Sequence, residues 1–228
     1  MSDHPDADLR HVLDCSADFY QSLHAVLGDT VEVSTKRDLL TQGTCSIAIE
    51  HGLSVCTLIE DGHLTSAIAL LRPQFEAVVR ALWLHDVATD DWLERYFQAA
   101  KANPMKDPNA SPQMTDMLNA LSSKRLAPAV RMLQALKDAA WGPMNSYIHS
   151  GIHPIVQHHT GFPPEYAIQA LRNANGLTGM AATLMAMMTN DGTIATGVRN
   201  AQLAHLDCLP PVGPTSVVPA TAATTPPA

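Results

Sequence analysis

Apolar residues recur every three or four positions over most of this chain, a spacing that gathers them on one face of an α-helix. The longest stretches with this spacing are residues 9–27, 34–60, 64–87, 128–141, 144–152, 165–188 and 193–206, and shorter ones begin near Asp91 and Ser111. Leu, Ala and Met are abundant, and aromatic residues make up only 5% of the chain, which favours helices over strands. The pattern predicts an all-α fold, a single bundle of about seven to eight helices.

Capping and breaking residues indicate where these helices begin and end. Ser34 is the predicted N-cap of the second helix, and Asp91 with Glu94 three residues later resembles a capping box. Gly142-Pro143 is expected to close the helix before it, because glycine and proline both disfavour its continuation. We therefore expect separate helices on the two sides of this dipeptide.

The end of the chain differs from the rest in composition. Residues 209–228 are rich in Pro, Ala, Thr and Val without helical periodicity, so we expect a disordered tail. Residues 1–208 are expected to form one all-α domain, since the chain length of 228 residues and the hydrophobic content of 46% fit a single core.

The net charge of −8 opposes a broad electrostatic grip on nucleic acid or on an anionic membrane surface, although a small basic cleft is compatible with it, and we expect neither DNA nor a membrane as a partner. The N-terminal sequence MSDHPDADLR lacks the basic and apolar regions of a secretory signal, which predicts a cytoplasmic protein. The longest apolar run, residues 176–188, is shorter than the roughly 18 to 20 residues that a membrane span needs. We expect this run to be a buried helix.

The chain contains four cysteines, and none of them forms a C-x-x-C pair. They are Cys15, Cys45, Cys56 and Cys208, of which the first three fall inside apolar helical patterns. Because free cysteine behaves as a small buried hydrophobe, we expect all four to be reduced thiols in the core.

Three charged residues lie on one face of the otherwise apolar helix predicted over residues 64–87. Arg72, Glu76 and Arg80 follow one another at four-residue steps. Charges are costly to bury unless they are paired, so Glu76 is expected to pair with Arg72, Arg80 or His149. The three residues form either a structural ladder of ion pairs or one wall of a polar pocket, in which the guanidinium groups hold a phosphate or a carboxylate.

Two segments of the chain carry a resemblance to a known group of proteins. The first is ALLRPQFE at residues 69–76, which continues to Trp83, and the second is NSYIHS at residues 145–150. Together they resemble a bacterial family of uncharacterised all-helical proteins that is similar in turn to the HEPN superfamily. The resemblance implies a HEPN-like topology, and HEPN-like proteins often dimerise with their motifs near the interface.

Active HEPN ribonucleases carry an arginine, a polar residue, three variable residues and a histidine, which together act on RNA without a metal ion. In this chain Asn145 matches the polar position and His149 the histidine, whereas Met144 stands where the arginine belongs. A histidine can serve as a general acid or base near neutral pH, but the phosphate charge still needs a cation. Arg72 or Arg80 of the neighbouring helix is the candidate for that role.

Four histidines cluster along the chain around the second motif, at positions 149, 153, 158 and 159. His149 is expected to be either a core histidine with a backbone or Glu partner or a functional contact, and His153 is counted with the binding residues. No carboxylate or thiol recurs at metal-ligand spacing, so we expect no metal site and no cofactor.

Other catalytic signatures are weak or missing from the sequence. The dipeptide His85-Asp86 resembles the metal-binding pair of the HD phosphohydrolases, in which an earlier histidine, here His51 or His63, would be a further metal ligand. A dipeptide alone is weak evidence, so we expect His85-Asp86 to have a structural role. The chain has no Gly-Lys-Ser/Thr phosphate loop, no G-x-G-x-x-G and no G-x-S-x-G elbow. The sequence therefore gives no support for a nucleotide-dependent enzyme.

One stretch of the helix predicted over residues 165–188 contains several small residues, namely Gly176, Gly179, Ala181 and Ala182. Small side chains let another backbone approach closely. They indicate either internal packing or a two-fold contact between two copies of the chain.

These observations predict a HEPN-like, non-catalytic binding or regulatory module, which the resemblance places in a bacterial stress or phage-defence system. The expected binding residues are Arg72, Glu76, Arg80, Asn145, His149 and His153. One alternative is a metal-independent endoribonuclease in which His149 and Asn145 act with Arg72 or Arg80. A second alternative is a structural interaction protein without a pocket. The expected partners are a second copy of the chain and either another protein or RNA.

Overall fold

The computed structural model of the protein describes residues 5–28, 34–102, 112–124 and 127–211. These residues form nine α-helices and one short 3-10 helix, with no strand among them, so the predicted all-α fold is confirmed. The elements are α1 (Pro5–Leu27), α2 (Lys36–Glu60), α3 (Leu64–Asp86), α4 (Asp90–Ala102), α5 (Met114–Leu121), α6 (Ala127–Ile148), α7 (Ile152–Thr160), α8 (Pro164–Met188), α9 (Gly192–Ala204) and η1 (Leu206–Cys208). The predicted count of about seven to eight helices is too low.

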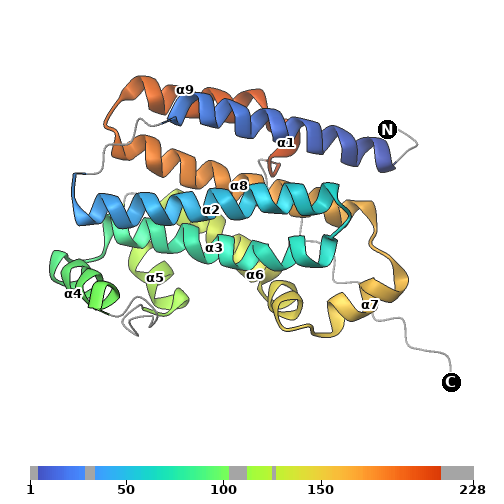
Figure 1. Ribbon diagram of the computed structural model, residues 1–228, viewed down its shortest axis with the longest axis horizontal. Coiled ribbons are helices and arrows are strands. Elements are labelled where there is room, and N and C mark those ends of the chain that lie inside the picture. The colour runs from blue at the N-terminus through green and yellow to red at the C-terminus, as the bar shows by residue number, and fades with distance from the viewer. Residues whose placement is uncertain (1–4, 29–33, 103–111, 125–126, 212–228) are drawn as a thin grey trace.

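Four long helices, α1, α2, α3 and α8, lie side by side and contribute most of the core (Figure 1). α2 packs against α3 and α8, and α8 also packs against α1 and α3. α9 packs on α1 and α8, whereas α5 and α6 pack on α3. α7 follows the end of α6, packs against it and lies at one end of the bundle (Figure 1).

One residue from each of the four long helices meets in a polar cluster inside the core. Gly52 of α2 lies against the polar ends of Tyr20, Gln74 and Thr178. The Tyr20 hydroxyl lies 2.9 Å from Thr178 Oγ1, and the Gln74 side-chain nitrogen donates to Thr178 Oγ1 at 3.2 Å and to the Ala174 carbonyl at 2.9 Å. A Cβ at position 52 would lie 2.4 Å from both hydroxyl oxygens. The missing side chain of Gly52 is therefore what leaves room for the cluster.

Two predicted helix N-caps are displaced, one by one residue and the other by two. Thr35, rather than Ser34, caps α2, and it forms a capping box with Asp38. The capping box predicted at Asp91 is wrong, because α4 begins one residue before it. Ser, Thr and Asp are nearly equivalent as caps, so a run of them locates a helix start only to within a residue or two.

The prediction that Gly142-Pro143 ends a helix is wrong, because α6 continues past both residues. Proline removes one backbone hydrogen bond from the helix. The turn that follows it, however, buries Met144 and Tyr147 in the core. Burial of two such side chains contributes roughly 1.5 to 3 kcal/mol each, enough to offset the lost bond. Pro154 lies in the first turn of α7, where its missing N–H is not needed.

The small residues of α8 pack inside the chain. Gly176 lies against Pro210, and Gly179 lies against α9. Ala181 and Ala182 are buried. The internal-packing interpretation of this stretch is confirmed.

The described chain remains packed close to its last residues. Leu209 packs against the core, and Pro210 contacts α8. Beyond residue 211 the predicted tail lies outside the described residues, so its disorder stays a prediction. Within the described ranges, no helix has both the length and the apolar character that a bilayer crossing requires.

We expect Gly52→Ala to lower the free energy of unfolding by about 2 kcal/mol, since overpacking a core typically costs 1 to 3 kcal/mol. The control is Gly43→Ala on the same helix, where an added Cβ would meet nothing within 4 Å. That change should instead stabilise the protein by about 0.5 to 1 kcal/mol, as alanine is the better helix former. Urea unfolding measures both, and equal stabilities would contradict the close packing around Gly52.

Candidate functional site

α3 and α6 pack together and bring two polar ridges into contact at the surface of the bundle. We call these residues the α3–α6 site: Arg72, Glu76 and Arg80 on α3, and Lys137, Trp141, Asn145 and His149 on or just after α6. Within each ridge the residues are four positions apart, so they follow one face of their helix.

Arg72 is the centre of the α3–α6 site. Its Nε donates to Glu76 Oε1 at 2.8 Å, and one of its Nη atoms donates to Asn145 Oδ1. The guanidinium carbon lies 4.7 Å from the centre of the Trp141 ring, a cation–π contact. Lys137 Nζ lies 5.9 Å from the centre of the same ring. A single guanidinium therefore joins the two helices.

The predicted pairing of Glu76 with Arg72 is confirmed. Their side chains remain 35% and 24% exposed, respectively, so the ion pair is partly solvated. Trp141 packs edge to face against the buried ring of Phe75, with the ring centres 5.9 Å apart. Arg80, one turn beyond Glu76, is half-buried. Arg72 thus bonds both along α3, to Glu76, and across to α6, to Asn145.

The second motif builds the turn from α6 to α7. Ser146 Oγ accepts a hydrogen bond from the His153 backbone N at 3.2 Å and so caps α7. The Gly151 backbone N donates to the Ser146 carbonyl at 2.7 Å, and a Cβ at position 151 would lie 2.6 Å from Ser146 Oγ. Ser150 adopts a left-handed conformation with φ of 51°. Ser146 and Ser150 of the motif, together with Gly151 directly after it, therefore have a structural role.

Met144, where the HEPN arginine is expected, lies in the core with 3% of its surface exposed. Tyr147, three residues later, is buried as well, and desolvation raises its pKa to about 12. This side of α6 faces the core, and Asn145 lies on another side. An arginine at position 144 would point into the core instead of toward the α3–α6 site.

His149 lies just beyond the end of α6 and is exposed, so its interpretation as a core histidine is wrong. Its backbone N donates to the Asn145 carbonyl at 3.1 Å, which places it one turn after Asn145. Within the described part of the chain, no side chain or carbonyl hydrogen-bonds to its imidazole. His153 is also exposed, and its described contact is the backbone bond that caps α7.

The side chains of His85 and Asp86 pair with each other. His85 Nδ1 lies 2.5 Å from Asp86 Oδ1, and His63, one of the nominal further ligands, stands at the opposite end of α3. Across the described residues, no group of three or more His, Cys, Asp or Glu side chains is placed to hold a metal ion.

Residues 45–211 match the profile of a family described as "Family of unknown function (DUF6988)". This match covers well over half of the chain and includes both ridges of the α3–α6 site. The chain belongs to this family. The prediction of an uncharacterised family is confirmed, and DUF6988 itself carries no assigned activity. No curated protein and no solved structure matches the chain.

Sequence reasoning found four residues of this DUF6988 site that are in contact or adjacent, namely Arg72, Glu76, Asn145 and His149, but it missed Trp141 and Lys137. The signal was available, because positions 137, 141, 145 and 149 have the same four-residue spacing as the ridge on α3. The predicted helix break at positions 142 and 143 separated them.

We expect Arg72→Ala to lower the free energy of unfolding by about 2 kcal/mol, because it removes a cation–π contact and two charge-assisted hydrogen bonds. Glu76→Ala removes one partly solvated pair and should cost roughly 0.5 kcal/mol. Arg131→Ala, at an exposed position of α6, is the control and should stay within about 0.5 kcal/mol of wild type. Thermal and urea unfolding compare the three, and an Arg72→Ala variant as stable as the control would contradict the central role of Arg72.

Proposed function

We propose that this DUF6988 protein is a non-catalytic, HEPN-like binding module whose α3–α6 site recognises a phosphate-bearing ligand, with RNA as the first candidate. The observation that carries the proposal is the Arg72 guanidinium, which is partly exposed, stacked on Trp141 and bonded to Asn145. A guanidinium binds phosphate oxygens in bidentate fashion, and an aromatic ring offers a surface on which bases stack. Lys137 and the exposed His149 add cationic or hydrogen-bonding capacity at the two ends of the ridge.

Two features support binding over catalysis. The Arg72 charge is already offset by Glu76 at 2.8 Å, which leaves less of it to stabilise the charge that develops on a phosphate during cleavage. The motif position from which a HEPN arginine acts is occupied by the buried Met144. A cytoplasmic location and a role in a bacterial stress or phage-defence system belong to the same proposal and rest on the sequence resemblance.

A metal-independent endoribonuclease is the second candidate. The contact between Arg72 and Asn145 favours it, because a cation from α3 reaches the polar residue of the motif. In this scheme His149 acts as the general acid or base, while Arg72 or Arg80 stabilises the phosphate charge. A structural protein without a ligand is the third possibility that the experiments below distinguish.

We expect the purified protein to bind a fluorescein-labelled single-stranded RNA, and His149→Ala to weaken this binding roughly tenfold, the effect of one charge-assisted hydrogen bond. The imidazole is exposed and makes no side-chain hydrogen bond within the described residues, so we expect the melting temperature not to change. Fluorescence anisotropy measures the affinity. His24→Ala, at an exposed position of α1, is the matched control and should bind like wild type.

Incubation of a structured RNA with a chelator present separates the candidates. We expect negligible cleavage by wild type. Robust cleavage that disappears in His149→Ala would instead establish the ribonuclease, and neither binding nor cleavage would leave the structural protein. Met144→Arg should destabilise the fold without restoring cleavage, because its guanidinium would enter the core.

We also propose that two copies of the chain associate through α7 and the end of α6. Four large aliphatic side chains are exposed there: Ile148 at 38%, Ile152 at 66%, Ile155 at 50% and Val156 at 44%. Residues 139–164 contain no Asp, Glu, Lys or Arg, in a chain whose net charge is −8. An apolar surface without charged residues keeps like charges out of the contact between two acidic copies, and two-fold contacts are the commonest oligomeric arrangement.

We expect wild type to be a dimer by size-exclusion chromatography with light scattering, and Ile152→Asp to be a monomer, because the new carboxylates would face each other across the contact. Leu203→Asp on α9 replaces a side chain that is 54% exposed and is the control, which should remain dimeric. A monomeric wild type, or equal effects of the two changes, would contradict an interface at α7.

A further inference from the structure

Three of the four cysteines gather where α1, α2 and η1 meet α8: Cys15 on α1, Cys56 on α2 and Cys208 on η1. The buried Asn175 of α8 organises this place. Its side-chain nitrogen donates to Ser16 Oγ at 2.8 Å and to the Cys208 carbonyl at 2.9 Å, while its Oδ1 lies 3.9 Å from Cys56 Sγ. One amide therefore holds η1 beside the turn of α1 that contains Cys15.

Cys15 and Cys208 lie on parts of α1 and η1 that pack against each other. One turn before Cys15, His11 Nε2 lies 3.2 Å from Asp207 Oδ2, and Asn175 bonds both Ser16, which follows Cys15, and the Cys208 carbonyl. Cys15 is half-buried and therefore within reach of solutes, whereas Cys208 is buried. Burial raises the pKa of Cys208, and it raises that of Cys56 to about 12, so both stay protonated at neutral pH. Cys15 is thus the thiol of the pair that a small oxidant meets first.

We propose that Cys15 and Cys208 are a redox modification site, at which hydrogen peroxide produces a reversible disulfide that fixes η1 on α1. The Cys15 thiolate attacks one peroxide oxygen, which gives a sulfenic acid, and the other oxygen leaves as water after it takes up a proton. The Cys208 sulfur then attacks the Cys15 sulfur, and the sulfenic hydroxyl leaves as water with the proton of the Cys208 thiol. Two thiols are oxidised, one peroxide is reduced, and a thiol reductant reverses the bond by exchange.

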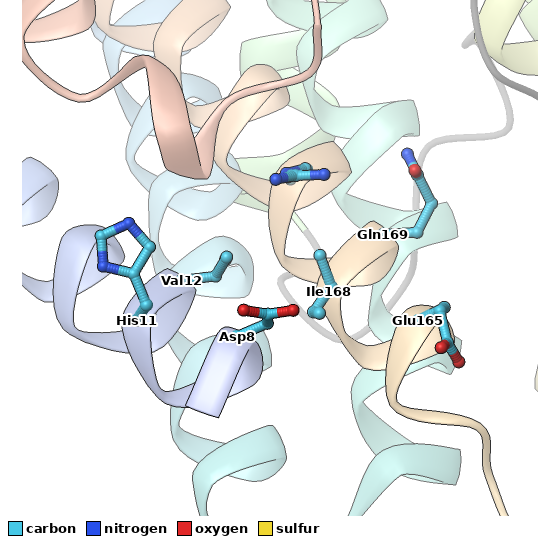
Figure 2. A pocket seen from close by; sticks show the side chains of 7 residues that line it. Asp8, His11, Val12, Glu165, Ile168 and Gln169 are labelled. Atoms are coloured by element: carbon cyan, nitrogen blue, oxygen red, sulfur yellow. The ribbon is translucent and has the colours of Figure 1, made fainter. Parts of the chain in front are cut away.

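The bond would change how η1 is held. In the reduced protein the outer contact of η1 is the pair His11–Asp207, whose side chains are 64% and 74% exposed, and exposed pairs contribute little. The Asp207 carbonyl also accepts a hydrogen bond from Arg172 Nε of α8 at 3.2 Å. Arg172 and His11 line a cleft of about 330 Å³ between α1 and α8, into which the Asp8 carboxylate points (Figure 2). A disulfide would fix η1 at the edge of this cleft.

The test oxidises the full chain, previously reduced, with hydrogen peroxide under native conditions, removes the peroxide with catalase and alkylates the remaining thiols. We expect two of the four thiols to be lost, and the intact mass to fall by that of two hydrogen atoms. Non-reducing peptide mapping should find one linked pair, containing Cys15 and Cys208. Hydrogen exchange over residues 206–209 should slow on oxidation and recover with dithiothreitol.

Cys15→Ser should abolish the linked pair, and Cys45→Ala, a change at the buried cysteine elsewhere on α2, should leave it intact. Four thiols that survive peroxide, further oxidation of Cys15 without a disulfide, or a bond that joins Cys56 would each overturn the proposal. Mapping of the wild-type chain decides the matter even if a variant fails to fold.

Discussion

Gly52 has no side chain where Tyr20, Gln74 and Thr178 converge on α2 from three other helices. Buried polar groups are stable only where they find partners, so each of these helices is restricted in its rotation about its own axis. A turn of α3 would carry the Gln74 amide, which is fully buried, away from Thr178 Oγ1 and the Ala174 carbonyl. The contact at Gly52 thus fixes which face of α3 points inward.

The geometry of the α3–α6 site follows from that orientation. With Gln74 and Phe75 turned into the core, Arg72 and Glu76, which come before and after them in the chain, lie at the surface of the bundle beside α6. Phe75 contributes a second time, because its buried ring packs against Trp141 and holds that indole where the Arg72 guanidinium stacks on it. The polar site is therefore an outward continuation of the packing in the core.

Local sequence signals located the helices and five of the seven residues of the α3–α6 site. They did not show the tertiary packing, which decides the outcome where two local signals conflict. Residues four positions apart are neighbours on a helix surface, so the ion pair of Arg72 and Glu76 could be predicted from their spacing in the sequence. Pro143 gives an equally clear local signal for a break, yet burial of Met144 and Tyr147 outweighs one lost backbone bond. Because burial depends on residues distant in the chain, the continuation of α6 could not be predicted, and the expected break concealed the four-residue spacing that places Trp141 on the same ridge as Asn145.

The second motif shows how a resemblance to an enzyme can arise from the demands of a fold. Ser146, Ser150 and Gly151 form the turn between α6 and α7. Asn145 holds Arg72 of α3. Each of these residues is needed for structure whether or not the protein acts on RNA, so the motif is weak evidence of catalysis.

Two positions, one buried and one exposed, bear on the choice between a binding module and a ribonuclease. Position 144 faces the core, so its orientation, and not only the identity of Met144, excludes it from contact with a phosphate at the α3–α6 site. His149 is exposed and makes no described side-chain hydrogen bond, so the fold does not explain its presence. His149 lies one turn after Asn145, the residue that Arg72 bonds, so a substitution at this exposed position tests the proposed ligand binding with the least change to the packing of the bundle.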